Sequence, residues 1–392
     1  MAYFAITKIL ISPDESLVPV FPDTLKKKYG IDKTVPMKEL PDGQGIFSYS
    51  FNLGLTSDNF TSAIMSHPGK SKIIFLPPGV YKPTLDEIKA GYLKIIGISD
   101  ESGNRPKIII TKNLVIAATS LQFKNVEIVI EPGHYRIIKC SDGAIMCCPN
   151  DDTTNVATAA NQFKRLCFKK CLFDVSLAEN KALNVYKVKN VSFKNCQFKF
   201  NGRNLMEVSL AETVNIYSNK FEGKGRIEFH TTNVILRENQ FVGEIYISMY
   251  AVQLGEIIRN QFKLSGKHLG FGIDQGSDIV FDTNHLEFVA PAVSEAVSET
   301  TDLFYLNRSS KCRIQHSAIN LGSSSLAMVQ WESKLYVDSN RFADAKVPIQ
   351  MYDDIKVGVG SNTYTLEDKS MEVEFVPSDD RVSKPTRRYY AC

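Results

Sequence analysis

The residues of this chain best suited to acid–base chemistry are three carboxylates and one imidazole: Glu207, Glu228, His230 and Asp274. Glycoside hydrolysis needs two carboxylates, about 5 Å or 6.5–9.5 Å apart according to the mechanism. With Arg226 or Arg237 acting as a base, the same residues can instead support β-elimination. The side chains therefore suit chemistry on a polysaccharide, provided that the fold brings them together.

Aromatic residues recur at comparable positions: Tyr186, Tyr250, Tyr305, Trp331 and Tyr352. Sugar rings stack on aromatic faces, while carboxylates and amides bind sugar hydroxyls. The same residues thus predict a glycan-binding surface without any reaction. A plainer interpretation is a solvated strand surface of mixed charge, because tyrosine favours strands. All three interpretations require a strand-based fold.

One phrase repeats about every 22 residues between Cys171 and Tyr364, and this period is typical of a solenoid. Clear copies are VSFKNCQF (191–198), VNIYSNKF (214–221) and VILRENQF (234–241). The copies close on Phe173, Phe198, Phe221, Phe241, Phe262, Leu286, Ile319, Phe342 and Tyr364. Each unit would bury its apolar side chains by stacking on the next unit.

The kind of solenoid follows from the residue types. The phrase at 188–198 also fits a leucine-rich repeat, but leucine is a minority at the apolar positions and strand-forming residues dominate. After Phe221 the sequence EGKG is followed by the alternating RIEFHTT, which is typical of a turn and a second strand. We therefore predict an all-β parallel β-helix with two or three short strands per coil.

Alignment of the coils on the closing residue places the acid–base and aromatic residues on one outward strand, 12 to 14 positions earlier. Residues in one register of successive coils lie about 4.8 Å apart. The alignment predicts a column of aromatic residues interrupted by acids. In coil order the column is Tyr186, Glu207 with Ser209, Glu228 with Arg226 and His230, Ser248 with Tyr250, Asp274, Tyr305 with Asn307, Gln330 with Trp331, and Gln350 with Tyr352.

The amino-terminal part supports this fold independently. Residues 57–83 predict a short amphipathic helix, a strand from Ile73 to Leu76 and a Pro-Pro-Gly turn into Val80 and Tyr81. A small capped helix is predicted from Thr84 to Gly91, and strands at 93–99 and 106–110. Here the sequence resembles the pectate-lyase-like superfamily of right-handed parallel β-helices, in which a helix caps the amino-terminal end.

The resemblance implies a fold rather than one activity. Superfamily members include polysaccharide-processing enzymes and tailspike-like proteins. The NTD, DD, GHG and RIK signatures of the polygalacturonase-like members do not occur in order, and the central coils lack the RxxP phrase of pectate lyases. If the protein is an enzyme, its catalytic residues are therefore not a set carried over from those members.

Asparagines recur at one turn: Asn219, Asn239, Asn260, Asn284, Asn340 and Asn362. Asparagine tolerates a left-handed backbone, and its amide can bond to the same amide one coil away. We predict an inner asparagine ladder that begins at Asn219, because Cys171 and Cys196 occupy the preceding positions. Its role would be structural.

The composition limits the partners. The formal charge is +3, from 46 basic and 43 acidic residues, which predicts neither nucleic acid nor an anionic membrane as a partner. No export signal or membrane span is evident, and Cys171, Cys196 and Cys312 fall on inward positions, so we expect free thiols formed in a reducing cytoplasm. The cysteine pairs at 147–148 and 167–171 have no matching second pair for zinc, and we expect no metal or cofactor.

The predicted organisation is an arm or capping module (1–56), the β-helix (57–364) and a tail or cap (365–392). Insertions at 141–162 and 289–302 would build a binding site or contact other subunits. The missing signatures favour a structural or binding protein of a virion or other large assembly, which contacts subunits in a homo-oligomer or larger particle, or glycans. The alternative is a lyase, glycoside hydrolase or epimerase that acts on polysaccharide.

Overall fold

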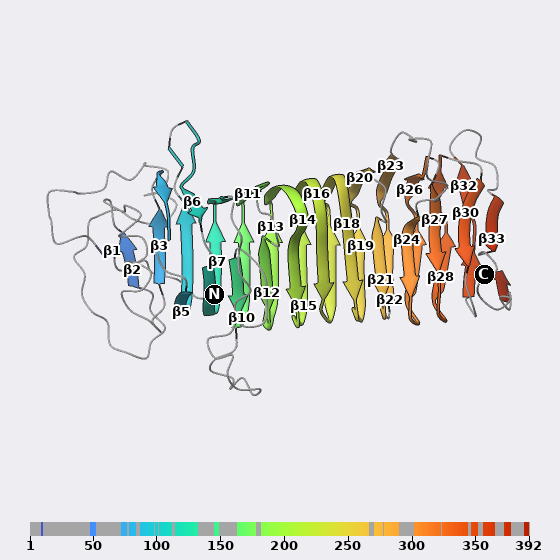
Figure 1. The fold of residues 1–392 in the computed structure, drawn as a ribbon, viewed down its shortest axis with the longest axis horizontal. Coiled ribbons are helices and arrows are strands. Elements are labelled where there is room, and N and C mark those ends of the chain that lie inside the picture. The colour runs from blue at the N-terminus through green and yellow to red at the C-terminus, as the bar shows by residue number, and fades with distance from the viewer. Residues whose placement is uncertain are drawn as a thin grey trace, which may run out of the picture.

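The computed structural model is a parallel β-solenoid (Figure 1). It describes residues 9–10, 48–51, 72–76, 78–83, 87–97, 99–100, 102–111, 114–131, 145–148, 163–177, 182–265, 270–276, 278–289, 302–322, 324–343, 346–351, 356–364, 372–377 and 388–391. Within these ranges the regular elements are all strands, and every strand pairing is parallel, as between Phe198 and Phe221. The predicted all-β parallel solenoid is confirmed.

Each regular coil contributes a strand to three stacks, which we call A, B and C in chain order. Stack A holds β9 (Ile145–Cys148), β12 (Leu183–Tyr186), β21 (Phe271–Asp274), β24 (Asp302–Asn307), β27 (Ser325–Val329), β30 (Lys346–Met351) and β33 (Glu372–Pro377). Two long strands run from stack A into stack B: β5 (Glu87–Gly97) and β7 (Leu114–Lys124). Three others run from stack C into stack A: β14 (Gln197–Ser209), β16 (Lys220–His230) and β18 (Gln240–Tyr250).

Stacks B and C hold the remaining strands. Stack B contains β1 (Ile9–Leu10), β2 (Ser48–Phe51), β3 (Lys72–Leu76), β10 (Phe163–Lys169), β13 (Val188–Lys194), β15 (Thr213–Tyr217), β17 (Asn233–Arg237), β19 (Leu254–Ile258), β22 (Asp278–Asp282), β25 (Lys311–Gln315), β28 (Lys334–Asp338), β31 (Lys356–Val359) and β34 (Arg388–Ala391). Stack C contains β4 (Val80–Tyr81), β6 (Lys107–Ile110), β8 (Glu127–Ile130), β11 (Leu172–Val175), β20 (Gln261–Ser265), β23 (His285–Val289), β26 (Ala318–Asn320), β29 (Arg341–Phe342) and β32 (Thr363–Tyr364).

The closing residues of the repeat share one register of stack C, and those from Phe173 to Phe342 form one continuous inward row, as predicted. Its central phenylalanine rings stack face to face: the ring centroids of Phe198 and Phe221 are 4.6 Å apart, and those of Phe221 and Phe241 are 4.8 Å apart. These side chains are almost fully buried. The repeat therefore encodes an aromatic stack that runs along the interior of the solenoid.

The asparagine ladder lies at the turn between stacks B and C. The backbone N–H of Asn219 donates to Oδ1 of Asn239 (2.9 Å), and the side-chain amide of Asn219 donates to the same atom (3.1 Å). The pattern repeats from Asn239 to Asn260 and from Asn260 to Asn284. At the amino-terminal end Cys196 donates its backbone N–H to Asn219, so the ladder begins where it was predicted.

Two details of the ladder differ from the prediction. The left-handed residue is the one before the asparagine, for example Ser218 (φ 53°) and Glu238 (φ 57°), in every ladder coil except that of Asn362, and not the asparagine itself. The sharp turn of the backbone thus falls on the preceding residue, whereas the asparagine supplies the buried amide of the ladder. Ser317 replaces asparagine in one coil and still accepts the backbone N–H of Asn284 at 3.1 Å.

Stack C passes into stack A through bends in the long strands. At Gly223 (φ 140°) a Cβ would lie 1.7 Å from the carbonyl oxygen of Phe200 on the preceding coil. Only glycine therefore allows the backbones to approach this closely. The EGKG sequence marks this bend within one continuous strand, β16.

The helix predicted from Thr84 to Gly91 is wrong in its described part, because β5 begins at Glu87 and pairs with β7 from Glu87 to Ile96. Strand pairing with the next coil outweighs the local capping pattern here. The amphipathic helix predicted near residue 57 lies outside the described residues. Of the two predicted terminal modules, the structure describes only β1, β2, β33 and β34.

Candidate functional site

The outward surface of stack A carries the predicted acid–base and aromatic residues in two adjacent rows. The strand register places Asn184, Glu207, Glu228, Ser248, Gly272, Tyr305, Met328 and Gln350 in the first row. Tyr186, Ser209, His230, Tyr250, Asp274 and Asn307 follow one another in the second. Glu207 and Glu228 are thus direct neighbours, whereas Tyr250 separates His230 from Asp274.

The strongest contacts on this surface centre on Arg226, which is the neighbour of Tyr246 on the next strand. Its Nε lies 2.5 Å from Oε1 of Glu228, and Nη2 donates to Oγ of Ser248 at 3.3 Å. The guanidinium also lies over the Tyr246 ring, 4.9 Å from its centroid. One arginine therefore fixes a carboxylate, a hydroxyl and an aromatic ring.

Tyr246 depends on a glycine one coil further on. A Cβ at Gly272 would lie 1.9 Å from the Tyr246 hydroxyl oxygen, so the phenol occupies the space that a side chain would fill. Burial raises the pKa of Tyr246 above its ordinary value. Neither residue was predicted. Tyr246 lies 16 positions before Phe262, outside the window of the coil alignment, and only its outward place in an alternating strand would have marked it.

A second group of contacts surrounds Tyr305 and Asp274. The Tyr305 hydroxyl donates to Oε1 of Gln330 at 3.1 Å, and Nε of Arg308 lies 3.5 Å from Oδ1 of Asp274. Burial, and then the nearby Asp274 carboxylate, raise the pKa of the Tyr305 phenol. We call the two groups together the stack A cluster: Arg226, Glu228, Tyr246, Ser248, Asp274, Tyr305, Arg308 and Gln330.

The other predicted residues lie at the margins of this cluster. The rings of His230 and Tyr250 are 5.4 Å apart, and the Ser209 hydroxyl donates to Glu207 at 2.7 Å. Trp331 follows β27 in a turn, where it has a left-handed backbone (φ 51°) and is 62% exposed. Tyr186 lies three coils before Tyr250, beneath the Lys187 ammonium. Tyr352 lies outside the described residues.

One candidate residue proves to lie elsewhere, and the two predicted insertions are barely described. Arg237 belongs to stack B, where it neighbours Tyr217 and Ile258, so it cannot serve as a base beside the stack A carboxylates. The insertion at 289–302 lies outside the described residues except at its two ends, and that at 141–162 is described only as β9. Among the stack A candidates, Arg226 is the base available for β-elimination.

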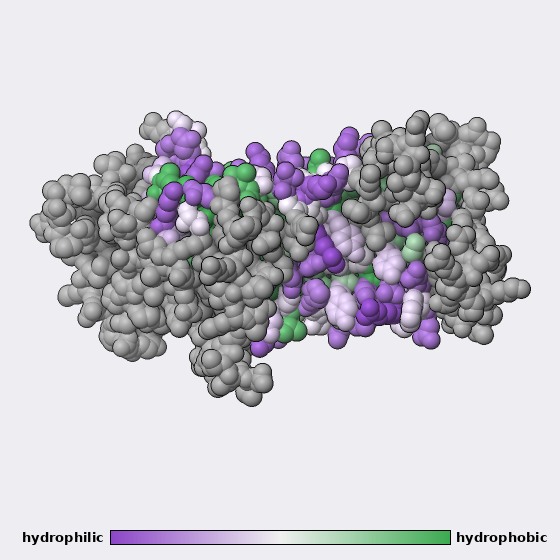
Figure 2. Space-filling view, viewed as in Figure 1, coloured by the Kyte–Doolittle hydropathy of each residue, from purple (hydrophilic) through white to green (hydrophobic). Residues whose placement is uncertain are grey.

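On the face that Figure 2 draws, the described residues are mostly hydrophilic, with hydrophobic ones scattered among them. Cys171, Cys196 and Cys312 are buried free thiols, which confirms their inward positions, and Cys167 is also a buried free thiol. In the described ranges, no group of three or more His, Cys, Asp and Glu side chains can hold a metal ion, and no helix could span a membrane.

Comparisons of the chain with protein-family models, curated proteins and solved structures found no match. The geometry of the stack A cluster is therefore the main evidence about function.

Proposed function

We propose that this chain is a structural and binding β-solenoid that presents the stack A cluster to a glycan. The observation that supports the proposal is the contact set of Arg226, which holds Glu228, Ser248 and the Tyr246 ring in fixed positions on one outward surface. A surface whose aromatic and polar groups are already ordered loses less entropy on binding than a flexible one.

The chemistry of the cluster matches the groups that a sugar presents. The carboxylates of Glu228 and Asp274 accept hydrogen bonds from hydroxyls, and Gln330 offers an amide. Tyr250, which is 37% exposed, offers a ring to the apolar face of a sugar. Because neighbouring coils lie about 4.8 Å apart, an extended glycan could contact several coils at once.

One observation favours the enzymatic alternative. Glu207 and Glu228 are register partners, and the strand spacing of about 4.8 Å is close to the carboxylate separation of about 5 Å in retaining glycosidases. Each carboxylate is however held by a neighbour, Glu207 by Ser209 and Glu228 by Arg226. These contacts suit fixed hydrogen-bond acceptors, and we place binding before catalysis.

A panel of neutral and acidic polysaccharides tests the binding. Tyr250→Ser should weaken binding of the recognised glycan at least tenfold, because it removes a stacking surface. The matched control is Tyr336→Ser, a tyrosine that faces outward from stack B. Equal losses in both variants, or no binding of any polysaccharide by the parent protein, would overturn the proposal.

The same incubations test catalysis through new reducing ends and absorbance near 235 nm. If either signal appears and Glu228→Gln abolishes it, the enzymatic alternative replaces the binding function. Glu212→Gln is the control, because Glu212 lies in the turn before β15 and, among the described residues, forms an ion pair with Lys189 away from the cluster.

We further propose a right-handed solenoid of the pectate-lyase-like superfamily that assembles into a virion or other large particle. Support comes from β3, β4 and β5, which lie where the family phrases predicted strands, and from the buried free thiols. Stacks B and C leave further outward surfaces for subunit contacts. Analytical ultracentrifugation should show a homo-oligomer, and a monomer at micromolar concentration would contradict the assembly.

A further inference from the structure

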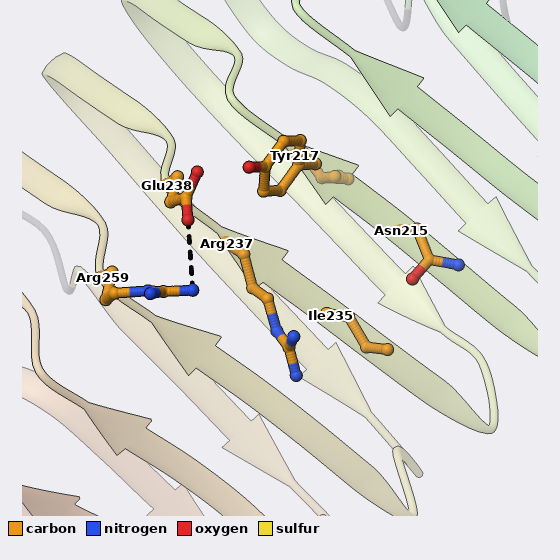
Figure 3. Close-up of a pocket in the computed structure, with 7 residues that line it drawn as sticks. Asn215, Tyr217, Ile235, Arg237, Glu238 and Arg259 are labelled. Atoms are coloured by element: carbon orange, nitrogen blue, oxygen red, sulfur yellow. Dashed lines mark ion pairs between the residues drawn. The ribbon is translucent and has the colours of Figure 1, made fainter.

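A depression of about 440 Å³ lies on stack B, on a different stack from the proposed glycan surface. Its volume is within the range of about 300–1,000 Å³ that is typical of small-molecule sites. Side chains of β15, β17 and the turns that follow β17 and β19 line it (Figure 3). The lining residues are Asn215, Ile216, Tyr217, Ile235, Arg237, Glu238 and Arg259.

One side of the depression offers an aromatic ring, an aliphatic side chain and an amide. Tyr217 and Asn215 face outward from β15, and the register pairs them with Arg237 and Ile235 on β17. The Lys194 ammonium lies 4.9 Å from the centroid of the Tyr217 ring. A flat or ring-shaped ligand can therefore rest on Tyr217 and Ile235 while the Asn215 amide binds its polar edge.

Arg237 is only partly engaged by the described residues. Nη2 contacts the Glu256 carboxylate, whereas the buried Nε donates to no acceptor among these residues. Figure 3 shows the guanidinium between Ile235 and the ion pair of Arg259 with Glu238, whose charged atoms are 3.1 Å apart. The Arg237 side chain is 41% exposed, so an oxyanion of a ligand would meet the guanidinium at its exposed edge.

The charges around the depression favour an anion. Lys194, Arg237 and Arg259 are positive, whereas Glu238 and Glu256 are negative, so the group carries a net positive charge. Both residues of the Arg259–Glu238 pair have left-handed backbones, with φ of 55° and 57°. The turns that follow β17 and β19 therefore place this ion pair beside Arg237.

We propose that this depression binds a six-membered ring that bears a carboxylate, with the ring on Tyr217 and the carboxylate at Arg237. The ring can belong to a sugar acid or to an aromatic acid, since both present the same chemistry. This site does not rest on the proposed glycan function of stack A.

Titration calorimetry and saturation-transfer NMR on the full chain test the site, with glucuronate, glucose and benzoate as probes. We expect glucuronate or benzoate to bind at least tenfold more tightly than glucose, and Arg237→Gln to weaken that binding about tenfold or more. The control is Arg313→Gln, which removes an exposed arginine from the same outward surface, two strands beyond β19. A thermal melt of each variant verifies that it is folded.

Preference for glucuronate identifies a sugar acid, and preference for benzoate identifies an aromatic acid. Equal affinity for glucose and glucuronate, equal effects of the two arginine variants, or no binding of either acid would each overturn the proposal. Tyr250→Ser on stack A should leave these affinities unchanged, which separates this site from the proposed glycan surface.

Discussion

The inner turn between stacks B and C and the outward surface of stack A are built from the same coils, but they differ in regularity. At the inner turn, Asn219, Asn239, Asn260 and Asn284 make the same hydrogen bonds coil after coil. On the outward surface, Glu228, Ser248, Gly272 and Tyr305 follow one another in a single row without any repetition. Stacking thus restrains the interior and leaves the exterior free to vary.

The difference indicates which residues should affect stability and which should affect recognition. A buried position must satisfy the same neighbours above and below, so it can hold only phenylalanine, asparagine or a close substitute. An outward position contacts solvent and can be chosen for a ligand. Substitutions in the two regions should therefore separate stability from binding.

The largest expected effect is on stability, from Phe221→Ala. This removes a fully buried ring that stacks on Phe198 and Phe241, and it should lower the free energy of unfolding by about 3–5 kcal/mol. Urea unfolding monitored by circular dichroism measures the loss. Phe221→Leu keeps much of the volume and should lose less. If the leucine variant lost as much as the alanine variant, the effect would come from ring stacking and not from buried volume.

The ladder comes next. In Asn239→Ala the backbone N–H and the amide of Asn219 lose their acceptor and the Ile216 carbonyl loses a donor, so about 2–4 kcal/mol should be lost. Asn239→Ser is the matched control, because Ser317 already occupies this position in another coil. The same urea experiment applies, and a serine variant as unstable as the alanine one would contradict this account.

The sequence predicted the interior well because residues of the same type recur at each inner position. The closing phenylalanines and the asparagines recur often enough to reveal the coil length, the inward row and the first ladder residue. The left-handed residue was misplaced by one position, since Ser218, Glu238 and Arg259 share no residue type that marks it. Backbone conformation there is imposed by stacking and not by the residue itself.

The exterior was predicted less completely. Alignment brought Glu207, Glu228 and Tyr305 to one row, but it omitted Tyr246 and Gly272, which fit one another only across neighbouring coils. It also left Arg237 as a candidate base beside the stack A carboxylates, although Arg237 lies on stack B. The helix predicted at 84–91 failed for a related reason, because pairing with β7 lies outside any local pattern.

A pH-dependent effect should distinguish one buried carboxyl of stack A from the outward ones. Burial raises the pKa of Asp302, which is 3% exposed, to about 6, although a hydrogen bond with Ser325 opposes the shift. The folded state therefore holds this proton more tightly than the unfolded state, whose pKa is about 3.9. The resulting stability is complete below about pH 4 and is lost as the pH rises through 6.

Asp302→Asn should consequently be more stable than the parent at pH 7.5, by about 2 kcal/mol, and the advantage should shrink toward pH 4. Thermal melts at intervals between pH 4 and 8 measure the difference. The exposed Glu212→Gln should show no such gain, because its surface pair with Lys189 contributes little. If Asp302→Asn proved less stable than the parent at pH 7.5, the raised pKa of Asp302 would be refuted.

The smallest effect on stability should come from Trp331→Gly, although its effect on binding should be large. Trp331 is mostly exposed and has a left-handed backbone, which costs a non-glycine residue about 1–2 kcal/mol. Glycine relieves this cost, but its greater freedom in the unfolded chain offsets part of the gain. The free energy of unfolding should therefore rise by less than about 1 kcal/mol. Glycan affinity should fall at least tenfold if the exposed indole is a stacking platform. Ser339→Gly, at a left-handed turn residue outside stack A, should have the same small effect on stability and leave binding unchanged. If Trp331→Gly bound glycan as well as the parent, Trp331 would have no role in glycan binding and would be an ordinary solvent-exposed residue.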